Sequence, residues 1–572
     1  MERDRIGFLL AQIYGEETAA AILPRLSSAL ENYRSRISTP RSARLTQRDS
    51  ILITYPDQIQ EADRPPLQTL TEFCARHLEG LVSGIHILPF YPWSSDDGFS
   101  VMDYRAVASQ YGAWNDIEQL GTDFRLMFDA VVNHASARSS WFQNFLHGDP
   151  AYKDYFIEVK GNPDLSRVVR PRALPLLTAF HTGAGETKIW TTFSADQADL
   201  NYHNPQVLLE VIELLLSYAG HGAEFIRLDA IAYIWKEIGT SCISLPQTHQ
   251  TVQLLRAVLD EAAPQVKLIT ETNVPHAENI SYFGDGTNEA QLVYNFALPP
   301  LVLHAFQTGD ASAFTRWASA LTLPSDKVAF FNFLASHDGI GLNPLRGILP
   351  EVEIEAMAER IESRGGLVSY KSNPDGSRSP YELNVNYFDA LSGPSDSVEQ
   401  NIERFVTAHA ILFSFVGLPG VYFHSLFGSR GWAEGVTRTG SNRSINRQKL
   451  RSENIESELA DENSMRARVF HRLSHLLKVR AAHAAFDPYG GQRVLEFGSG
   501  VFAILREARG EQVLCLHNLT ASSQVLIMNS GETLWPSPVE WRDLITGQTF
   551  SSGEKSPLAL EPYQTLWLSN NP

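Results

Sequence analysis

The chain has 572 residues, which is enough for one large domain and one or two smaller ones. Hydrophobic residues make up 43% of the sequence and charged residues 20%, as is typical of a globular protein with a large core. The formal net charge of −18 argues against nucleic acid or an anionic membrane as the main partner, although clustered arginines can still make a pocket locally positive.

The first residues predict a helix and not a targeting signal. MERDRIGFLLAQIYGEE carries charges on both sides of a short apolar patch, which is unlike a signal peptide. No run reaches the roughly 18 apolar residues of a membrane-spanning helix. The three cysteines, Cys74, Cys242 and Cys515, lack metal-ligand spacing, and their odd number favours reduced thiols. We therefore expect a soluble, cytoplasmic protein with a helical N-terminal extension at 1–48.

From position 50 onward, short runs rich in β-branched residues alternate with longer amphipathic segments such as PQVLLEVIELLLSYAG, which begins at Pro205. The β-runs are ILITY (51–55), GIHILPFYP (84–92), LMFDAVVNH (126–134), EFIRLDAIAY (224–233), VKLITETN (266–273), QLVYNFAL (291–298), VAFFNFLASHD (328–338) and LPGVYFHS (418–425). Eight runs separated by helices predict an α/β protein with a (β/α)8 TIM barrel at 49–484. An open, doubly wound sheet uses the same alternation and is the alternative.

Two connections in this pattern are too long for simple loops. Residues 135–200 include RVVRPRALPLLTAFH, and residues 339–400 include SRGGLVSYKSNPDGSRSPYELN. Loops of this length are usually functional or form small subdomains, so we expect inserted subdomains in both places. After about position 485, short alternating strands with turns predict a C-terminal all-β domain at 485–572.

Ionisable and amide side chains stand at the C-terminal ends of several runs: Asn133, His134, Asp229, Glu271, His337 and Asp338. In a (β/α)8 barrel, every strand delivers its last residues to the same mouth, where catalytic groups gather. This placement favours the barrel over the open sheet.

The run FIRLDAIAY (225–233) combines apolar residues with Arg227 and Asp229. Burying two charges costs several kcal/mol per ion unless each has a partner, so the run taken alone fits a structural ion pair as well as catalysis. Arg227 lies on the same side of the strand as Asp229 and can keep it ionised and aimed. With Glu271 and Asp338 at the same mouth, the set suits glycosidic chemistry, in which one carboxylate attacks, one protonates the leaving oxygen and one supports the transition state.

Four motifs resemble the ordered signature regions of glycoside hydrolase family 13, the α-amylase superfamily: DAVVNH (129–134), FIRLDAIAY (225–233), LITETN (268–273) and FLASHD (333–338). The resemblance spans roughly positions 50 to 570. It implies a nucleophile, an acid/base and a transition-state stabiliser, which are Asp229, Glu271 and Asp338 in that order. It also implies three groups that bind glucose or support the nucleophile: His134, Arg227 and His337.

A finer resemblance is to the sucrose phosphorylase branch of that family, through IRLDAIAYIWKEIGTSC, FALPPLVLHA and SHDGIG. The segments SSDDGF, TTFSADQ and SINRQKL are similar to the branch's donor-site loops. This similarity implies a donor pocket closed around one glucosyl unit by Asp96, Phe99, Phe193 and Arg447. An enzyme with such a blind pocket is expected to act on disaccharide-like glucosides and not on polymers.

On the acceptor side, the resemblance implies that Arg172 in RPRALP binds phosphate and that Tyr233 and Tyr381 line the same site. A guanidinium suits phosphate because it can bind two oxygens at once. Without the resemblance, Arg172 would be read as a solvated loop arginine.

Two positions depart from the sucrose phosphorylases: Asn273 replaces a histidine, and Glu382 replaces a glutamine of the acceptor loop. ITETNVPH and NPDGSRSPYELN are closer to the glucosylglycerol and glucosylglycerate phosphorylases of the branch. The resemblance implies a retaining, reversible phosphorylase that releases α-glucose 1-phosphate. Because a Glu382 carboxylate can accept hydrogen bonds from two hydroxyls, we predict that the glucoside is 2-O-α-glucosylglycerol and that the acceptor is glycerol. Glucosylglycerate phosphorylase, or sucrose or sucrose 6-phosphate phosphorylase, is the alternative.

Two other functions remain open at this point. A hydrolase or transglucosidase of the same fold would act without phosphate, and a catalytically silent sugar-binding subunit would not need the intact acids. No Cys/His cluster or calcium loop is visible, so we expect no metal and no cofactor, with phosphate as a co-substrate. The expected partners are a small glucoside and phosphate, and the expected assembly is a monomer or homodimer.

Overall fold

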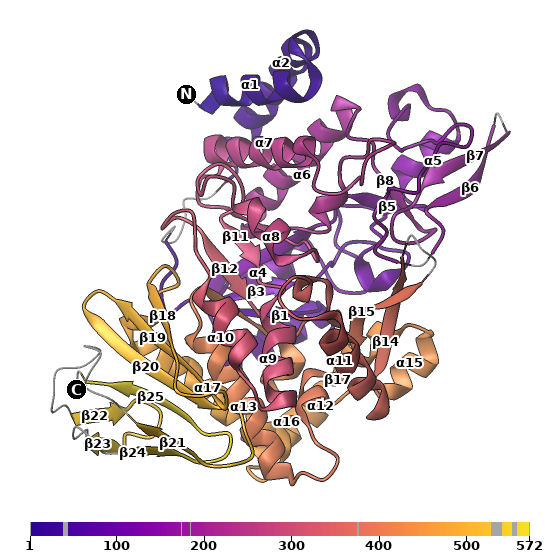
Figure 1. The fold of residues 1–572 in the computed structure, drawn as a ribbon. Helices are drawn as coiled ribbons and strands as arrows, with labels where there is room; N and C mark the ends of the chain where they lie inside the picture. The colour runs from indigo at the N-terminus through magenta and orange to yellow at the C-terminus, as the bar shows by residue number, and fades with distance from the viewer. Residues whose placement is uncertain are drawn as a thin grey trace.

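The computed structural model describes residues 2–37, 44–172, 174–183, 185–373, 377–527, 540–551 and 557–570. Its centre is a closed barrel of eight parallel strands, each paired with the next one along the chain, and the last pairs with the first. The strands are β1 (Ile51–Thr54), β3 (Gly84–Ile87), β4 (Arg125–Ala130), β9 (Ala223–Leu228), β10 (Lys267–Thr270), β11 (Leu292–Tyr294), β12 (Ala329–Asn332) and β16 (Leu418–Tyr422). Figure 1 shows the barrel strands β1, β3, β11 and β12 in the middle of the molecule. The predicted barrel and its eight runs are confirmed, and the open sheet is wrong.

The barrel strands are buried on both faces, which explains why they read as continuous apolar runs and not as alternating ones. All four residues of β1 are buried, and so are all five of β16. Gly420 in β16 shows how tightly the interior is packed, because a Cβ added there would lie 2.4 Å from the Phe331 ring.

Helices surround the barrel. They are α3 (Pro66–Leu78), α4 (Trp114–Asp123), α6 (Pro205–Gly220), α7 (Pro246–Ala262), α8 (His276–Asn279), α9 (Leu298–Thr308), α10 (Ser312–Ser319), α13 (Val398–Ser414) and α17 (Met465–Ala482). All of them except α17, which follows the last barrel strand, lie in the connections between the barrel strands. Their starts follow the local sequence. The Asn204 side chain accepts a hydrogen bond from the Gln206 backbone N–H and precedes Pro205 at the first position of α6. Ser397 and Gln400 form a capping box at the start of α13.

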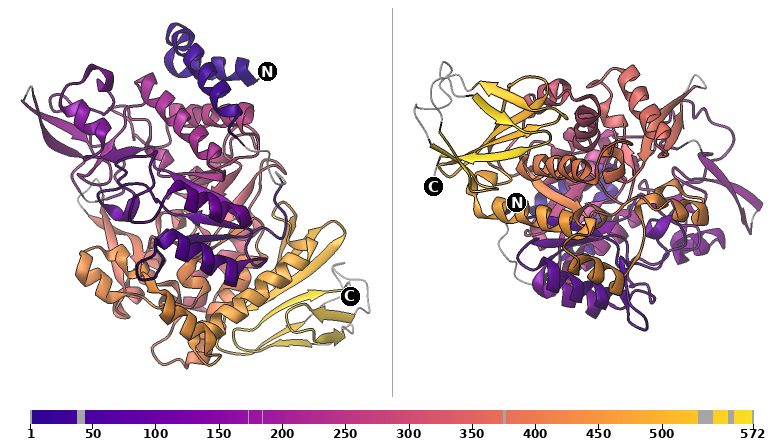
Figure 2. Two further views of the ribbon diagram at one scale, coloured as in Figure 1. Left: turned by 180° about the vertical axis from the view of Figure 1, so that it is seen from behind. Right: turned by 90° about the horizontal axis from the view of Figure 1, so that it is seen from below.

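The N-terminal segment forms a helical hairpin, α1 (Glu2–Tyr14) and α2 (Glu16–Arg34), that packs on α6 and α7. Its apolar side chains belong to the same core as the barrel. The Tyr14 hydroxyl donates a hydrogen bond of 2.8 Å to the Tyr202 carbonyl, and Arg25 pairs with Glu210 and Glu213 at 3.3 Å each. Figure 2 shows this hairpin at the end of the molecule opposite the C-terminal strands.

Both long connections contain structure. The first holds β5 (His134–Ser136), α5 (Ser140–Leu146), β6 (Leu177–Thr182), β7 (Gly185–Trp190) and β8 (Gln197–Asp199). The second holds β13 (Ile340–Gly341), α11 (Glu351–Ser363), β14 (Leu367–Ser372), β15 (Arg378–Asn384) and α12 (Tyr387–Leu391). The hairpins β6–β7 and β14–β15 lie on the same side of the barrel in Figure 1.

After β16 the chain forms α14 (Phe423–Leu426), α15 (Ala433–Thr439), a 3-10 turn η6 (Asn442–Asn446), β17 (Leu450–Arg451) and α16 (Ser452–Ala460). The predicted C-terminal β region is present. It has a sheet of β18 (Gly491–Leu495), β19 (Val501–Ala508), β20 (Glu511–Asn518), β25 (Thr565–Ser569), β22 (Glu540–Asp543) and β23 (Thr549–Ser551), and a separate pair of β21 (Gln524–Ile527) and β24 (Pro557–Leu560). Among the helices of the described ranges, none is both long and apolar enough to cross a membrane. All three cysteines lie in the described part of the chain and are buried free thiols.

Candidate active site

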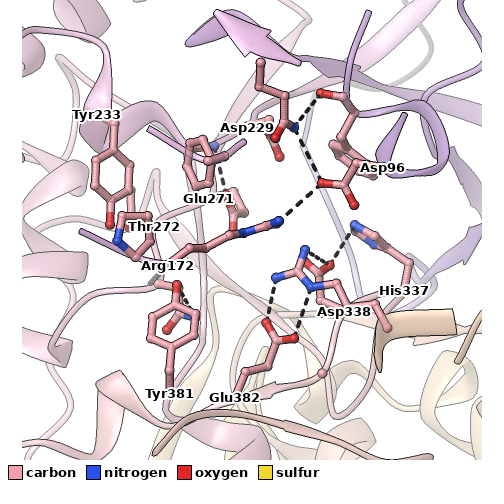
Figure 3. A pocket seen from close by; sticks show the side chains of 18 of the residues that line it. Asp96, Arg172, Asp229, Tyr233, Glu271, Thr272, His337, Asp338, Tyr381 and Glu382 are labelled. Carbon is pink, nitrogen blue, oxygen red and sulfur yellow. Dashed lines mark hydrogen bonds and ion pairs between the residues drawn. The ribbon is translucent and has the colours of Figure 1, made fainter. Parts of the chain in front are cut away.

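Three carboxylates meet at the C-terminal mouth of the barrel. Asp229 directly follows β9, Glu271 directly follows β10, and Asp338 lies in the loop after β12. All three line one cavity, which Figure 3 shows from close by. The parallel order of the strands places these residues together although 109 positions separate the first from the last.

Arg227 in β9 holds the base of this cavity together. Its side chain is only 3% exposed, and its Nη1 donates to Asp229 Oδ1 at 2.9 Å and also to Asp129. Its Nη2 lies 3.8 Å from Glu271 Oε2. Asp129 is bound on its other side by His86 Nε2 at 2.8 Å. A buried guanidinium with three carboxylate neighbours is a paired charge, so the expected aiming contact between Arg227 and Asp229 is present in the structure.

Burial gives Asp229 and Glu271 unusual acidities. It raises the pKa of Glu271 to about 7, against the opposing effect of Arg227 and with a further increase from the negative charge of Asp229. Burial likewise raises the pKa of Asp229, and Arg227 opposes it. A carboxyl group with a pKa near neutrality can donate a proton at physiological pH and accept one later, as a general acid/base must.

The turn after Asp229 has a strained backbone. Ala230 has φ 48° and ψ 32°, a left-handed conformation that is uncommon for a residue with a side chain. The Ala230 backbone N–H donates a hydrogen bond to Glu271 Oε2 at 2.9 Å. The turn after Asp229 thus holds Glu271, while Arg227 holds Asp229.

The predicted donor-side residues surround one end of the cavity: Asp96, Phe99, His134, Phe193 and His337. Asp96 has φ 53° in the short turn η1 (Asp96–Gly98), and its carboxylate lies 3.5 Å from Arg447 Nη1. Burial alone would raise the pKa of Asp96, but Arg172 and Arg447 hold it below its usual range. The rings of Phe99 and His337 stack with centroids 4.7 Å apart.

Arg447 lies behind this end of the cavity. It is 3% exposed, and its guanidinium binds Asp97 Oδ2 at 2.6 Å, the His337 carbonyl at 2.9 Å and Asp338 Oδ1 at 3.3 Å. The contacts fix the loop after β12 against the turn at 96–98. Arg447 and Arg227 are the two predicted site residues that support the cavity from behind and do not line it.

The predicted acceptor-side residues line the other end: Arg172, Tyr233, Asn273, Tyr381 and Glu382. Arg172 reaches into the middle of the cavity, where its Nη2 lies 3.4 Å from Asp96 Oδ2 (Figure 3). Asn273 donates to the Tyr381 hydroxyl at 3.4 Å.

Glu382 differs from its expected state. Its side chain is 4% exposed, and both of its oxygens bind Arg443, at 3.0 Å to Nε and 2.6 Å to Nη2. Asn384 donates a further hydrogen bond of 2.6 Å to Oε1. A carboxylate that is neutralised in this way does not offer two free oxygens to the hydroxyls of an acceptor, which differs from the free carboxylate expected from the sequence.

Sequence reasoning missed several lining residues, of which Gln197 and Arg443 are the most informative. Gln197 donates to the Phe99 carbonyl at 3.1 Å and lies within the predicted motif TTFSADQ. Arg443 stands four residues before Arg447 in SNRSINRQKL, and its Nη1 lies 2.6 Å from Asp338 Oδ1. The spacing of four residues from the predicted residue Arg447 was the sequence signal that pointed to Arg443.

Comparison with known proteins gives consistent matches. The family model of the α-amylase catalytic domain matches residues 77–339. The chain is 49% identical to a glucosylglycerate phosphorylase of Spirochaeta thermophila, covering 99% of this chain and 98% of that protein. It is 47% identical to a glucosylglycerate phosphorylase of Escherichia coli, covering 99% and 100%. A glucosylglycerol phosphorylase of Marinobacter adhaerens is 29% identical, covering 76% and 88%.

A solved structure has the same fold. The sucrose 6F-phosphate phosphorylase of Thermoanaerobacter thermosaccharolyticum superposes with a TM-score of 0.74 at 24% sequence identity. The match covers 90% of this chain and all of that one.

Proposed function

The chain belongs to the α-amylase family, glycoside hydrolase family 13, and from this premise we propose that it is a retaining phosphorylase of α-glucosylglycerate. The proposed reaction converts the glucoside and inorganic phosphate into α-glucose 1-phosphate and glycerate. The observation that carries the choice of acceptor is the Arg443–Glu382 ion pair, which leaves the acceptor end of the cavity without a free glutamate charge.

This proposal replaces glycerol, the acceptor first predicted. That prediction depended on a free Glu382 carboxylate, which would also repel the carboxylate of glycerate. With Glu382 paired, Arg172 is left to attract an anion at that end of the cavity. The relatives that match along nearly the whole chain are glucosylglycerate phosphorylases, whereas the glucosylglycerol phosphorylase matches less of it at lower identity. Glycerate, first kept as the alternative, is therefore the better supported acceptor.

In the proposed mechanism, an oxygen of Asp229 attacks the anomeric carbon while Glu271 gives its proton to the glycosidic oxygen. Glycerate leaves, and a glucosyl ester on Asp229 remains. A phosphate oxygen then attacks the same carbon from the vacated side, Asp229 leaves, and the proton released by phosphate passes to Glu271. Asp338 supports the positive charge that develops in both steps. Two inversions give net retention, so the product is the α anomer.

The test runs the reaction in the synthetic direction with α-glucose 1-phosphate as donor and D-glycerate, glycerol and fructose as acceptors. D-Glycerate should give the highest kcat/KM by a wide margin. A preference for glycerol or fructose would overturn the acceptor and keep the phosphorylase. Release of glucose at a rate independent of phosphate in the forward direction would instead identify a hydrolase.

A further inference from the structure

The geometry points to Arg443 as a second cation of the site that binds the anionic acceptors, with Glu382 adjusting its charge and not contacting the acceptor. This inference rests on the proposed function, because it concerns the glycerate carboxylate and phosphate that the proposed reaction exchanges. Arg443 was not among the residues expected from the sequence, and Glu382 was expected to bind hydroxyls directly.

The bonds of Arg443 leave part of its guanidinium available. Nε and Nη2 donate hydrogen bonds to Glu382, and Nη1 forms an ion pair with Asp338 Oδ1 at 2.6 Å. A guanidinium carries five N–H groups, so one hydrogen on each of the two Nη atoms remains unassigned by these three contacts. The side chain is 22% exposed, and Arg443 lines the active-site cavity. The exposed part of its charge therefore faces the place where reactants bind.

A second hollow adjoins the active-site cavity, and we call it the outer hollow. It shares five lining residues with the cavity: Pro171, Arg172, Tyr381, Glu382 and Arg443. The rest of its lining is Ser369, Tyr370 and residues 440–442. Two cations and one anion thus line the outer hollow, in a protein whose net charge is −18. A locally positive hollow of this kind favours the approach of anions.

The proposed reaction needs two cations at this end of the cavity. Glycerate and phosphate occupy the same place in turn. Asp229 is ionised while the glycerate group is bound and Glu271 is ionised when phosphate arrives, so each anion meets one carboxylate that repels it. Arg172 is partly engaged by Asp96, so its charge is not fully available to an incoming anion. Phosphate carries more than one negative charge near neutral pH, and a second guanidinium beside Arg172 would balance it.

The negative charge of Glu382 determines how strongly Arg443 attracts anions. Without its partner, Arg443 would attract anions more strongly, but its full charge would also oppose Asp338, which has to support a developing positive charge. Glu382→Gln should therefore lower the KM for both phosphate and glycerate by roughly fivefold and lower kcat. A Glu382 that binds the acceptor's hydroxyls would behave differently, because Glu382→Gln would then raise the KM for glycerate and leave the KM for phosphate unchanged.

The decisive experiment is a double-mutant cycle of Arg443→Gln and Glu382→Gln. The double variant removes both charges of the ion pair, so it keeps the local charge balance while it removes the cation. Its KM for phosphate and for glycerate should rise about 10- to 100-fold, as expected for a lost charge-assisted contact. Its KM for α-glucosyl fluoride, whose leaving group has no carboxylate or phosphate, should change much less than its KM for phosphate or glycerate.

Two controls accompany the cycle. Arg438→Gln removes an exposed arginine of α15 that lines neither hollow, and it should leave both KM values unchanged. Arg443→Lys keeps the positive charge but loses the planar, two-pronged guanidinium. Its KM values for phosphate and glycerate should therefore lie between those of the wild type and the double variant. Melting temperatures of all variants show whether each is folded.

Recovery of wild-type KM values in the double variant would overturn the inference, because Arg443 would then serve only to neutralise Glu382. A wild type that uses glycerol and not glycerate would overturn the proposed acceptor instead. In that case the KM for phosphate in the cycle still decides whether Arg443 binds anions, so the two failures are distinguishable.

Discussion

Replacing Glu271 with Gln should make the protein more stable at alkaline pH while it removes the acid/base. Burial raises the pKa of Glu271 from its ordinary value of 4.5 to about 7, and the nearby charge of Asp229 adds to the increase. At a pH between 4.5 and about 7, Glu271 keeps its proton in the folded state and loses it in the unfolded state. Stability therefore falls as pH rises through this window, and above it the full cost of the buried charge remains. Glutamine has nearly the same shape, can still accept the hydrogen bond from the Ala230 N–H, and never carries this charge.

The size of the effect follows from the pKa. A rise from 4.5 to about 7 corresponds to about 3 kcal/mol at pH 8 and less than about 1 kcal/mol at pH 5, at about 1.4 kcal/mol for each pKa unit. For 572 residues, the unfolding entropy near the melting temperature is about 1.2 kcal/mol/K, so 3 kcal/mol corresponds to about 2–3 °C.

The assay is thermal unfolding of the wild type and Glu271→Gln at pH 5 and pH 8, with Glu355→Gln, an exposed position on α11, as the matched control. The gain from Glu271→Gln should be about 2–3 °C at pH 8 and clearly smaller at pH 5, and the control should show no such difference. Phosphorolysis by the variant should fall by about 10²- to 10⁴-fold. A variant that is no more stable than the wild type at pH 8 would refute the argument that burial raises this pKa.

Three further predictions concern other groups. Asp229→Asn should keep the fold and lower turnover by several orders of magnitude, and NMR of the wild-type product should show α-glucose 1-phosphate; the β anomer would exclude double displacement. Arg172→Ala should raise the KM for phosphate about 10- to 100-fold, well beyond any change for the glucoside, and should let hydrolysis compete; unchanged phosphate kinetics would place the anion elsewhere. Lys236, whose buried ammonium binds Asp199 and donates to Asn133 at 2.7 Å, supports the loop that carries His134, so Lys236→Met should destabilise the protein by about 3–5 kcal/mol in thermal or urea unfolding. A melting temperature equal to that of the wild type would contradict this last prediction.

The barrel could be predicted because each strand has the same local requirement, an apolar run that is buried on both faces. Strands buried on both faces are mostly apolar, so β1 and β12 each stood out as short runs between amphipathic helices. The catalytic carboxylates could be located for a related reason, since the end of each parallel strand leads to the same mouth.

The acceptor end of the cavity could not be derived in the same way. Glu382 and Arg443 are 61 residues apart, and each lies outside the barrel strands, on β15 and η6. Their pairing depends on how two long connections fold over the mouth, and no periodic pattern records that. Glu382 read alone is a free carboxylate, and this reading led to glycerol. A single ion pair cancels the negative charge that an acceptor would otherwise meet.

The N-terminal hairpin has a consequence for any attempt to make a smaller catalyst. Leu9, Leu10 and Leu26 of α1 and α2 are almost completely buried in the same core as the barrel, against α6 and α7. These two helices flank β9, the strand that leads to Asp229. A version trimmed to begin at the first barrel strand would expose that apolar surface to water and would tend to aggregate during expression. Engineers who graft this active site onto a shorter scaffold would have to redesign the outer faces of α6 and α7, and not only the loops at the mouth.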